Sequence, residues 1–255
     1  MAELAEYANK YQNIKMERRN GILLVTLHTD GGSLRWGLVP HRDLPLAFYD
    51  IANDHDNKVV ILTGTGDEFS GPRVTDTGHP LFPTRPPMEV IDRLVSEGRQ
   101  GLMNFLNIDV PIISAVNGPA WRHSELPLLA DIVLATDTAA FQDSAHFTGG
   151  LVPGDGMHVV YPLLLGVNRA RYFLLTGQTL TAQKALELGL IAEILPADKL
   201  QARAWELAQQ IAAKPKSLVR MTRAVLTEHL KRHMQDYLGF GLYVEMLALM
   251  DRPDA

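Results

Sequence analysis

Short apolar runs alternate along this chain with longer segments in which apolar residues recur every three or four positions. The runs at 59–62, 112–116 and 132–135 have the length and composition of buried strands. The segment 88–107 instead carries a stripe with helical spacing. This stripe comprises Val90, Leu94, Leu102, Phe105 and Leu106. Strands that alternate with helices in this way predict an α/β fold.

Turn and helix signals define the other predicted elements. Alternating segments at 13–18 and 22–28 flank Asn20-Gly21, a dipeptide typical of a tight hairpin turn. A helix is expected over 41–53, with Pro45 in its first turn, where proline is tolerated. Further helices are expected at 157–165, 169–175, 182–188, 199–213 and, with a break, 217–249.

Composition excludes several classes of function. The 255 residues are 46% hydrophobic, and the net charge of -5 without a basic run argues against nucleic acid as a partner. The absence of cysteine excludes disulfides, a thiol nucleophile and thiolate metal sites. Residues 1–13 lack the features of a signal peptide, and no apolar run approaches the ~20 residues of a membrane span. We therefore expect a soluble, cytoplasmic protein that acts on a small molecule.

Three motifs carry a family resemblance. Residues 163–200 read LLLGVNRARYFLLTGQTLTAQKALELGLIAEILPADKL, Asn117-Gly118 follows the apolar run at 112–116, and the segment 141–156 begins with FQD and ends with PGDG. These motifs resemble the crotonase (enoyl-CoA hydratase) superfamily. The resemblance implies a crotonase-like ββα spiral core over residues 1–197. It also implies a C-terminal helical region over 198–255 that builds a homotrimer or a dimer of trimers.

The positions that carry thioester chemistry in that superfamily differ here. Crotonases hold the thioester oxygen with two backbone N–H groups from glycine-rich turns, because glycine permits close approach. In this chain one of these turns carries Trp121-Arg122-His123, and the other contains Pro72, which has no N–H. Ala145 occupies the position of one catalytic glutamate. These departures argue against a thioester substrate.

The substituted residues resemble one branch of the superfamily, the β-diketone hydrolases related to 6-oxocamphor hydrolase. That branch pairs a histidine of an FQDxxHF element with the aspartate of PGDG, which here are His146 and Asp155. A second histidine after NGP corresponds to His123, and the C-terminal helix supplies Glu245. The resemblance implies that these four residues are catalytic. We also expect substrate contacts from Trp36, His41, Trp121 and Phe82, the last within an irregular loop over 71–87.

Retro-Claisen cleavage of a cyclic or bicyclic β-diketone needs a hydroxide equivalent, a group that holds charge on the attacked carbonyl, and a proton for the departing enolate carbon. Our hypothesis is that His146 takes a proton from water while Asp155 fixes its tautomer, since the pKa of histidine lies near neutral pH. His123 would donate to a substrate carbonyl, and Glu245 would orient a histidine or the water. Direct attack by water would yield a keto acid.

Two other functions fit the same sequence. Glu125 stands where hydratases keep a catalytic glutamate, which favours a CoA-thioester hydratase, isomerase or thioesterase. A crotonase fold can also serve as a non-catalytic binding protein. The histidines lack metal-ligand spacing, and Thr63-Gly64-Thr65-Gly66 lacks the lysine of a phosphate-binding loop, so we expect neither a metal nor a cofactor.

Overall fold

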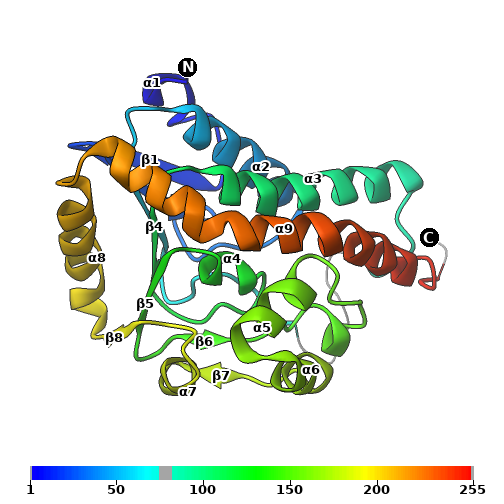
Figure 1. The fold of residues 1–255 in the computed structure, drawn as a ribbon. Coiled ribbons are helices and arrows are strands. Elements are labelled where there is room, and N and C mark those ends of the chain that lie inside the picture. Colours follow the sequence, from blue (N-terminus) through cyan, green and yellow to red (C-terminus); the bar gives the residue numbers. More distant parts are fainter. Residues whose placement is uncertain (1, 75–81, 254–255) are drawn as a thin grey trace.

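The fold is built around a six-stranded sheet in the order β1-β2-β3-β4-β5-β8 (Figure 1). The computed structural model describes residues 2–74 and 82–253. Strands β1 and β2 are antiparallel, and every later neighbour pair is parallel. The strands are β1 Ile14–Arg19, β2 Ile22–Leu27, β3 Val59–Gly64, β4 Ile112–Val116, β5 Ile132–Thr136 and β8 Glu193–Leu195. A small antiparallel pair joins β6 Ala140–Phe141 to β7 Leu180–Thr181. The predicted α/β fold is confirmed.

Helices cover both faces of this sheet. They are α1 Leu4–Tyr7, α2 Leu38–Asn53, α3 Met88–Asn107, α4 Glu125–Leu128, α5 Met157–Leu165, α6 Val167–Thr176, α7 Ala182–Glu187, α8 Ala197–Ala212 and α9 Lys216–Leu249, with a 3₁₀ turn at Phe147–Gly149. The predictions for 88–107 and 157–165 match to the residue. None of the helices in residues 2–74 and 82–253 is long and apolar enough to cross a membrane.

The predicted hairpin turn is confirmed by its backbone. Asn20 and Gly21 have φ angles of 54° and 82°, in the left-handed region that asparagine and glycine tolerate best. Strands β1 and β2 pair from Ile14 opposite Leu27 to Arg19 opposite Ile22. The two residues between them therefore form the turn that the sequence predicts.

Alternate residues of the central strands face two separate apolar layers. In β3, Val60 and Leu62 join the main core, whereas Val59 and Ile61 pack with Leu200 of α8 on the opposite face. Figure 1 shows α8 on one side of β4 and β5, and helices α4 and α5 on the other. A parallel sheet that is covered on both faces has continuously apolar strands, which explains the uninterrupted runs in the sequence.

Two expectations about helices are wrong. Helix α2 begins at Leu38, so Pro45 lies inside the helix and Pro40 occupies its first turn. The amide of Asn104 donates to the carbonyl oxygen of Pro45 (2.9 Å) from the neighbouring α3. Helix α9 runs from Lys216 to Leu249 without the predicted break. In both cases packing against other elements overrides the local preference of the sequence.

Helix α9 belongs to the same packed unit as the sheet. Its residues Leu238, Leu242 and Met246 are members of the main core. The helix lies against α3 and α5. The sequence-based boundary between residues 197 and 198 therefore falls at the start of α8, while the core continues across it.

Candidate active site

The site begins where β3 and β4 end at the same edge of the sheet. The side-chain oxygen of Asn117 accepts a hydrogen bond from Gly64 N–H (3.0 Å), and its amide donates to the Gly66 carbonyl oxygen (2.9 Å). These bonds tie the exit of β4 to the exit of β3. Gly118 is required here because a Cβ on it would lie 2.0 Å from the Asp67 carbonyl oxygen.

Buried hydroxyl groups fix the turn that follows. Ser70 donates through Oγ to the Arg122 carbonyl oxygen (2.5 Å), and Ser144 donates to that of Trp121 (2.6 Å). Ser124 Oγ lies 2.7 Å from Tyr161 Oη. Within this fixed turn His123 has a φ angle of 50°, in the left-handed region. The backbone therefore keeps a conformation suited to glycine, although it carries a histidine.

A cavity lies between α2, α3 and α9 and is closed by segments 122–126 and 145–155. Its volume is about 80 Å³. Four predicted catalytic residues line it: His123, His146, Asp155 and Glu245. The two imidazoles therefore share one cavity, as the hypothesis requires. The wall formed by α2 and α3 is mostly apolar and includes Leu44, Phe48, Leu94 and Leu102.

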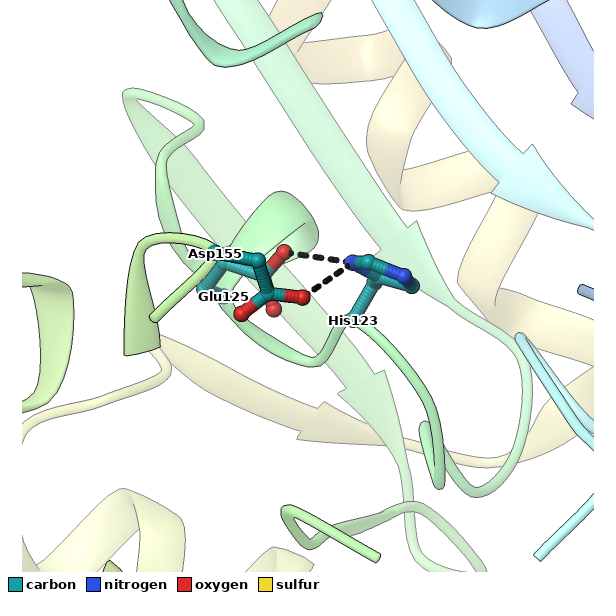
Figure 2. Close-up of side chains that lie close together, drawn as sticks. All are labelled: His123, Glu125 and Asp155. Carbon is teal, nitrogen blue, oxygen red and sulfur yellow. Dashed lines mark hydrogen bonds and ion pairs between the residues drawn. The ribbon is translucent and has the colours of Figure 1, made fainter. Parts of the chain in front are cut away.

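One ring nitrogen of His123 faces two carboxyl groups (Figure 2). Its Nδ1 lies 3.0 Å from Glu125 Oε1 and 3.1 Å from Asp155 Oδ2. Glu125 is held at the start of α4, and Asp155 comes from the PGDG segment before α5. Because Nδ1 is engaged by the protein, Nε2 is the nitrogen of His123 that remains for a substrate.

His146 is surrounded by three carboxylates. Its Nδ1 lies 2.5 Å from Asp143 Oδ1, while its Nε2 lies 3.3 Å from Asp155 Oδ2 and 3.6 Å from Glu245 Oε1. The hypothesis from the sequence made Asp155 the carboxylate that fixes the tautomer of His146. The structure instead places Asp143 on Nδ1 and Asp155 on the opposite nitrogen. Asp155 thus lies between the two histidines.

Burial and neighbouring charges set the protonation of this cluster. Although burial opposes it, Asp143 and Asp155 hold the pKa of His146 well above its ordinary value. Burial alone would raise the pKa of Asp155, but the neighbouring His146 and His123 hold that pKa well below its ordinary value. Burial raises the pKa of Glu245 to about 7 and lowers that of His123 to about 4. Near neutral pH His146 is therefore cationic, His123 is neutral and Glu245 is close to half ionised.

Glu125 and Arg122 also take part in this electrostatic environment. Burial, followed by the nearby Asp155, raises the pKa of Glu125 well above its ordinary value. Burial lowers the pKa of Arg122, which is 2% exposed and lines the same cavity. The sequence singled out Glu125 only for the thioester alternative and assigned no role to Arg122. In the structure both residues border the predicted catalytic groups.

The predicted substrate contacts separate into two groups. Trp36, His41 and Phe82 line the cavity. The ring centroid of His123 lies 3.9 Å from that of Trp36 and 5.0 Å from that of His41, so these rings form one aromatic cluster. Nε1 of Trp36 is buried and has no hydrogen-bond partner within residues 2–74 and 82–253.

Trp121 differs from the other predicted contacts because it lies outside the cavity lining. Its indole Nε1 donates to Glu68 Oε1 (3.0 Å), and the guanidinium of Arg73 lies over its ring at 4.7 Å. The expectation that Trp121 contacts a ligand in this cavity is therefore not met. The side chain is turned toward the segment after β3.

One backbone amide in each of the two turns that bind thioester oxygens in crotonases is engaged within the protein. Gly71 N–H donates to the Leu34 carbonyl oxygen (2.9 Å), and Trp121 N–H donates to the Ser70 carbonyl oxygen (2.9 Å). Pro72 lies next to the first of these groups. This arrangement agrees with the expectation that the thioester oxyanion site is altered.

Asp143 is the main residue that reasoning from the sequence missed. Its carboxylate lies against His146, the predicted catalytic histidine, whereas the expected partner of that ring was Asp155, the aspartate of PGDG. The available signal was its position three residues before His146, in FQDSAHF. Glu97 of α3 was also missed, because only the apolar residues of this helix were used for the prediction. Glu97 interrupts the apolar stripe where that stripe borders the cavity.

Two groups of side chains have the donor atoms to hold a divalent cation. They are His123, Glu125 and Asp155, and His146, Asp155 and Glu245, and within each group the donor atoms lie within 4.8 Å of one another. The same distances suit hydrogen bonds between imidazole and carboxyl groups. The expectation of a metal-free site stays a prediction.

Comparison with known proteins identifies two kinds of relative. The enoyl-CoA hydratase/isomerase family profile matches residues 17–246. A probable peroxisomal enoyl-CoA hydratase of Arabidopsis thaliana is 31% identical over 210 residues, covering 80% of this chain and 72% of the relative. A probable enoyl-CoA hydratase of Mycobacterium bovis is 29% identical over 228 residues, covering 82% and 75% respectively.

Among solved structures, a β-diketone hydrolase shows high similarity in both sequence and fold. This protein, from the cyanobacterium Anabaena sp. PCC 7120, was solved with (S)-3-oxocyclohexyl acetic acid. It is 46% identical, with a TM-score of 0.91 over 96% of this chain and 97% of its own. An enoyl-CoA hydratase/isomerase from Mycobacterium paratuberculosis is 25% identical, with a TM-score of 0.83 over 93% and 94%. The predicted crotonase fold is confirmed.

Proposed function

This chain belongs to the enoyl-CoA hydratase/isomerase family, and over nearly its whole length it resembles a solved β-diketone hydrolase. We propose that it hydrolyses a carbon–carbon bond of a cyclic or bicyclic β-diketone. The observation that carries this proposal is the cavity. It gathers His123, His146, Asp155 and Glu245 against an apolar wall. Such a wall suits a neutral carbocyclic substrate, and the polar cluster suits attack by water.

Water activation is assigned to the group around Nε2 of His146. With three carboxylates around it, His146 holds its proton near neutral pH, so the neutral ring of our first hypothesis is not its resting state. Glu245, with a pKa of about 7, is the member of the group that can accept a proton there. Its Oε2 is buried and has no hydrogen-bond partner in the described part of the chain. Glu245 therefore takes the proton from water, and His146 and Asp155 orient that water.

His123 and Trp36 are assigned to the attacked carbonyl. Because its pKa is raised, the carboxyl group of Glu125 keeps its proton and donates a hydrogen bond to Nδ1 of His123, 3.0 Å away, which leaves the ring proton of His123 on Nε2. The indole N–H of Trp36 supplies a second donor from the adjacent ring. Two such donors replace the backbone amides of thioester enzymes.

The proposed reaction adds one molecule of water and needs no other reactant. The water oxygen forms a bond to one carbonyl carbon, and the bond from that carbon to the carbon between the carbonyls breaks. The bonding pair leaves as the enolate of the second carbonyl. The enolate carbon then takes the proton that was removed from water, which gives a keto acid. This is a retro-Claisen cleavage.

The proposal is tested by incubation with symmetric bicyclic β-diketones and mass spectrometry for the addition of one water. Glu245→Gln should reduce kcat by about 10²–10⁴-fold, the range for loss of a general base. His146→Ala and Asp155→Asn remove the groups that orient the water, so each should also reduce kcat. Exposed residues outside the cavity provide matched controls, His55→Ala and Asp137→Asn, which should retain the wild-type rate. Excess EDTA should leave the rate unchanged. No turnover across the diketone panel would contradict the proposal.

The principal rival is a CoA-thioester activity, which the enoyl-CoA hydratase names of the curated relatives and the position of Glu125 in the cavity favour. Calorimetric titration with crotonyl-CoA separates the two functions. We expect no binding at millimolar ligand, because Gly71 N–H and Trp121 N–H of the two turns are engaged within the protein, and no hydration, because Ala145 supplies no second catalytic carboxylate. Micromolar binding with hydration of the acyl group would favour the rival.

A further inference from the structure

We propose that Asp143 is a positioning residue of the hydrolytic site, which keeps a proton on Nδ1 of His146 and thereby directs Nε2 toward Asp155, Glu245 and the cavity. The role that we assign to it rests on the proposed function. Nothing in the family resemblance assigned this role, since there Asp155 was paired with the histidine.

The contacts of Asp143 with His146 support this assignment. One carboxylate oxygen, Oδ1, lies 2.5 Å from Nδ1 of the ring and also accepts the backbone N–H of His146 at 3.3 Å. Asp143 is 2% exposed and His146 is 3% exposed, so water does not compete for this contact. By comparison, the two carboxylates on Nε2 are 3.3 Å and 3.6 Å away. Asp143 is therefore the nearest partner of the ring.

Asp143 acts from behind the ring. His146, Asp155 and Glu245 line the cavity, whereas Asp143 is absent from its lining. A ligand in the cavity thus meets Nε2 of His146 and the carboxylates beside it, and does not meet Asp143. Any effect of Asp143 on the reaction must pass through the orientation and proton of the imidazole.

The chain on both sides holds Asp143 in place. Gln142 N–H donates to the Ala120 carbonyl oxygen (3.2 Å), and its side-chain amide donates to that of Gly177 (2.7 Å). Ser144 N–H donates to the Trp121 carbonyl oxygen at 3.2 Å. After His146, the 3₁₀ turn Phe147–Gly149 begins directly. The segment that carries the aspartate and the histidine is therefore anchored to the turn that carries His123.

This arrangement gives each carboxylate a separate task. With Asp143 on Nδ1, Asp155 is left beside Nε2 of His146 (3.3 Å), between that ring and the ring of His123 (3.1 Å). Asp155 and Glu245 then serve the nitrogen of His146 that faces the cavity, where the water is activated. Without Asp143, no acceptor holds the proton on Nδ1, so the ring of His146 can lose that proton and turn, and Nε2 is no longer held toward Asp155 and Glu245.

The kinetic test is Asp143→Asn, which keeps the side-chain shape but removes the obligate acceptor. We expect kcat on a bicyclic β-diketone to fall by about 10²–10⁴-fold with KM changed less than about threefold, since Asp143 does not contact substrate. Asp137→Asn, an exposed aspartate in the same region of the chain, is the matched control and should keep wild-type kinetics. Wild-type kcat in Asp143→Asn would overturn the proposal.

The direct test is NMR of protein labelled with ¹⁵N-histidine, with the ring of residue 146 assigned through His146→Gln. We expect a protonated Nδ1 with a low-field proton resonance in the wild type, its loss in Asp143→Asn and its retention in Asp155→Asn. The opposite pattern in the two variants would overturn the proposal. If Asp143→Asn does not fold, the wild-type spectrum decides, because an unprotonated Nδ1 contradicts the assignment.

The ring measurement does not depend on turnover, so it separates this inference from the proposed function. If Nδ1 of His146 is protonated in a way that depends on Asp143 but the protein cleaves no diketone, the proposed function is refuted, whereas the effect of Asp143 on the ring is supported. If the wild type cleaves diketones and Asp143→Asn changes neither the protonation of the ring nor kcat, the proposed function is supported and the role of Asp143 is refuted.

Discussion

His123 combines a chemical task with an unfavourable backbone. Its φ of 50° costs an ordinary residue roughly 1–2 kcal/mol relative to glycine. We predict that His123→Gly is more stable than His123→Ala by about 1 kcal/mol, because both variants lose the imidazole and only glycine relieves the backbone. Both should lose diketone hydrolysis. Urea denaturation of the two variants measures the difference.

The comparison has a built-in control at a position with an ordinary backbone. Ser124, the next residue, has a φ of -68°, so there the glycine variant should be less stable than the alanine variant. Equal stability of the two variants at position 123 would show that the turn relaxes without the histidine. It would remove strain as an explanation for this residue.

Glu245 should make stability depend on pH. Its pKa is raised by burial from 4.5 to about 7, so between these values the folded protein holds a proton that the unfolded chain has released. The contribution of this group to the free energy of unfolding therefore falls as pH rises from 4.5 to 7 and is constant above. We predict that Glu245→Gln gains stability relative to wild type across this window, by on the order of 2 kcal/mol.

Denaturation of both proteins at pH 4.5, 6 and 7.5 checks this prediction. His41 and His123, with pKa values lowered by burial to about 3 and 4, give a dependence of opposite sign at acidic pH. They are present in both proteins, so the difference between the two curves isolates Glu245. A difference that is independent of pH would show that Glu245 ionises normally.

The candidate residues were predictable where a side chain breaks a local rule. A histidine in a turn built for glycine is such a case, and His123 does line the cavity. Asp143 breaks no rule in the sequence, because a buried aspartate and an exposed one look alike before the chain folds. The prediction for Trp121 was not met because nearness in sequence does not fix the direction of a side chain. His123 faces the cavity, whereas the indole of Trp121 reaches Glu68.

At the scale of elements, the site depends on how closely the PGDG segment approaches helix α9. A Cβ on Gly241 would lie 2.2 Å from His158 Cε1 and 2.5 Å from the Gly154 carbonyl oxygen. This close contact brings Asp155 and Glu245 to the same histidine. We predict that Gly241→Ala loses roughly 1–3 kcal/mol of stability and most diketone hydrolysis, because the loop must move away from the helix.

Gly239 on the same helix is the matched control for that prediction. Apart from the backbone of the helix itself, no atom of residues 2–74 and 82–253 lies within 4 Å of a Cβ built at this position, so Gly239→Ala should stabilise the helix by about 0.5–1 kcal/mol and keep activity. Thermal unfolding and initial rates of both variants provide the measurement. If both substitutions stabilise the protein, the PGDG segment can move away from α9 without loss of stability, and the prediction is wrong.

Elements were predictable to the extent that local sequence decides them. The stripe at 88–107 and the Asn20-Gly21 turn carry their own signals, and both match the structure. The continuity of α9 through Gly239 and Gly241 depends on what packs against it. The position of Pro45 inside α2 likewise depends on packing, because the amide of Asn104 in α3 donates to its carbonyl oxygen. Neither partner is adjacent in sequence, so a local reading cannot find them.

At the scale of the whole molecule, helix α9 has two different apolar faces. One enters the main core through Leu238, Leu242 and Met246. The other is exposed along the helix and includes Leu218, Met221, Val225, Leu226, Tyr237, Phe240, Tyr243 and Leu247. An exposed apolar surface of this length is unusual on a monomer and indicates a surface that is covered in an assembly.

We predict that this face joins copies of the chain into a homotrimer or a dimer of trimers. Val225 and Phe240 are 76% and 75% exposed, and a glutamate at either position would place charge in an apolar contact. Val225→Glu combined with Phe240→Glu should therefore give monomers in light scattering, whereas the wild type should have three or six times the mass of the monomer. Lys199→Glu, an exposed change on helix α8, should leave the assembly intact. A wild-type monomer at micromolar concentration would contradict the prediction, and so would a trimer that survives both glutamates.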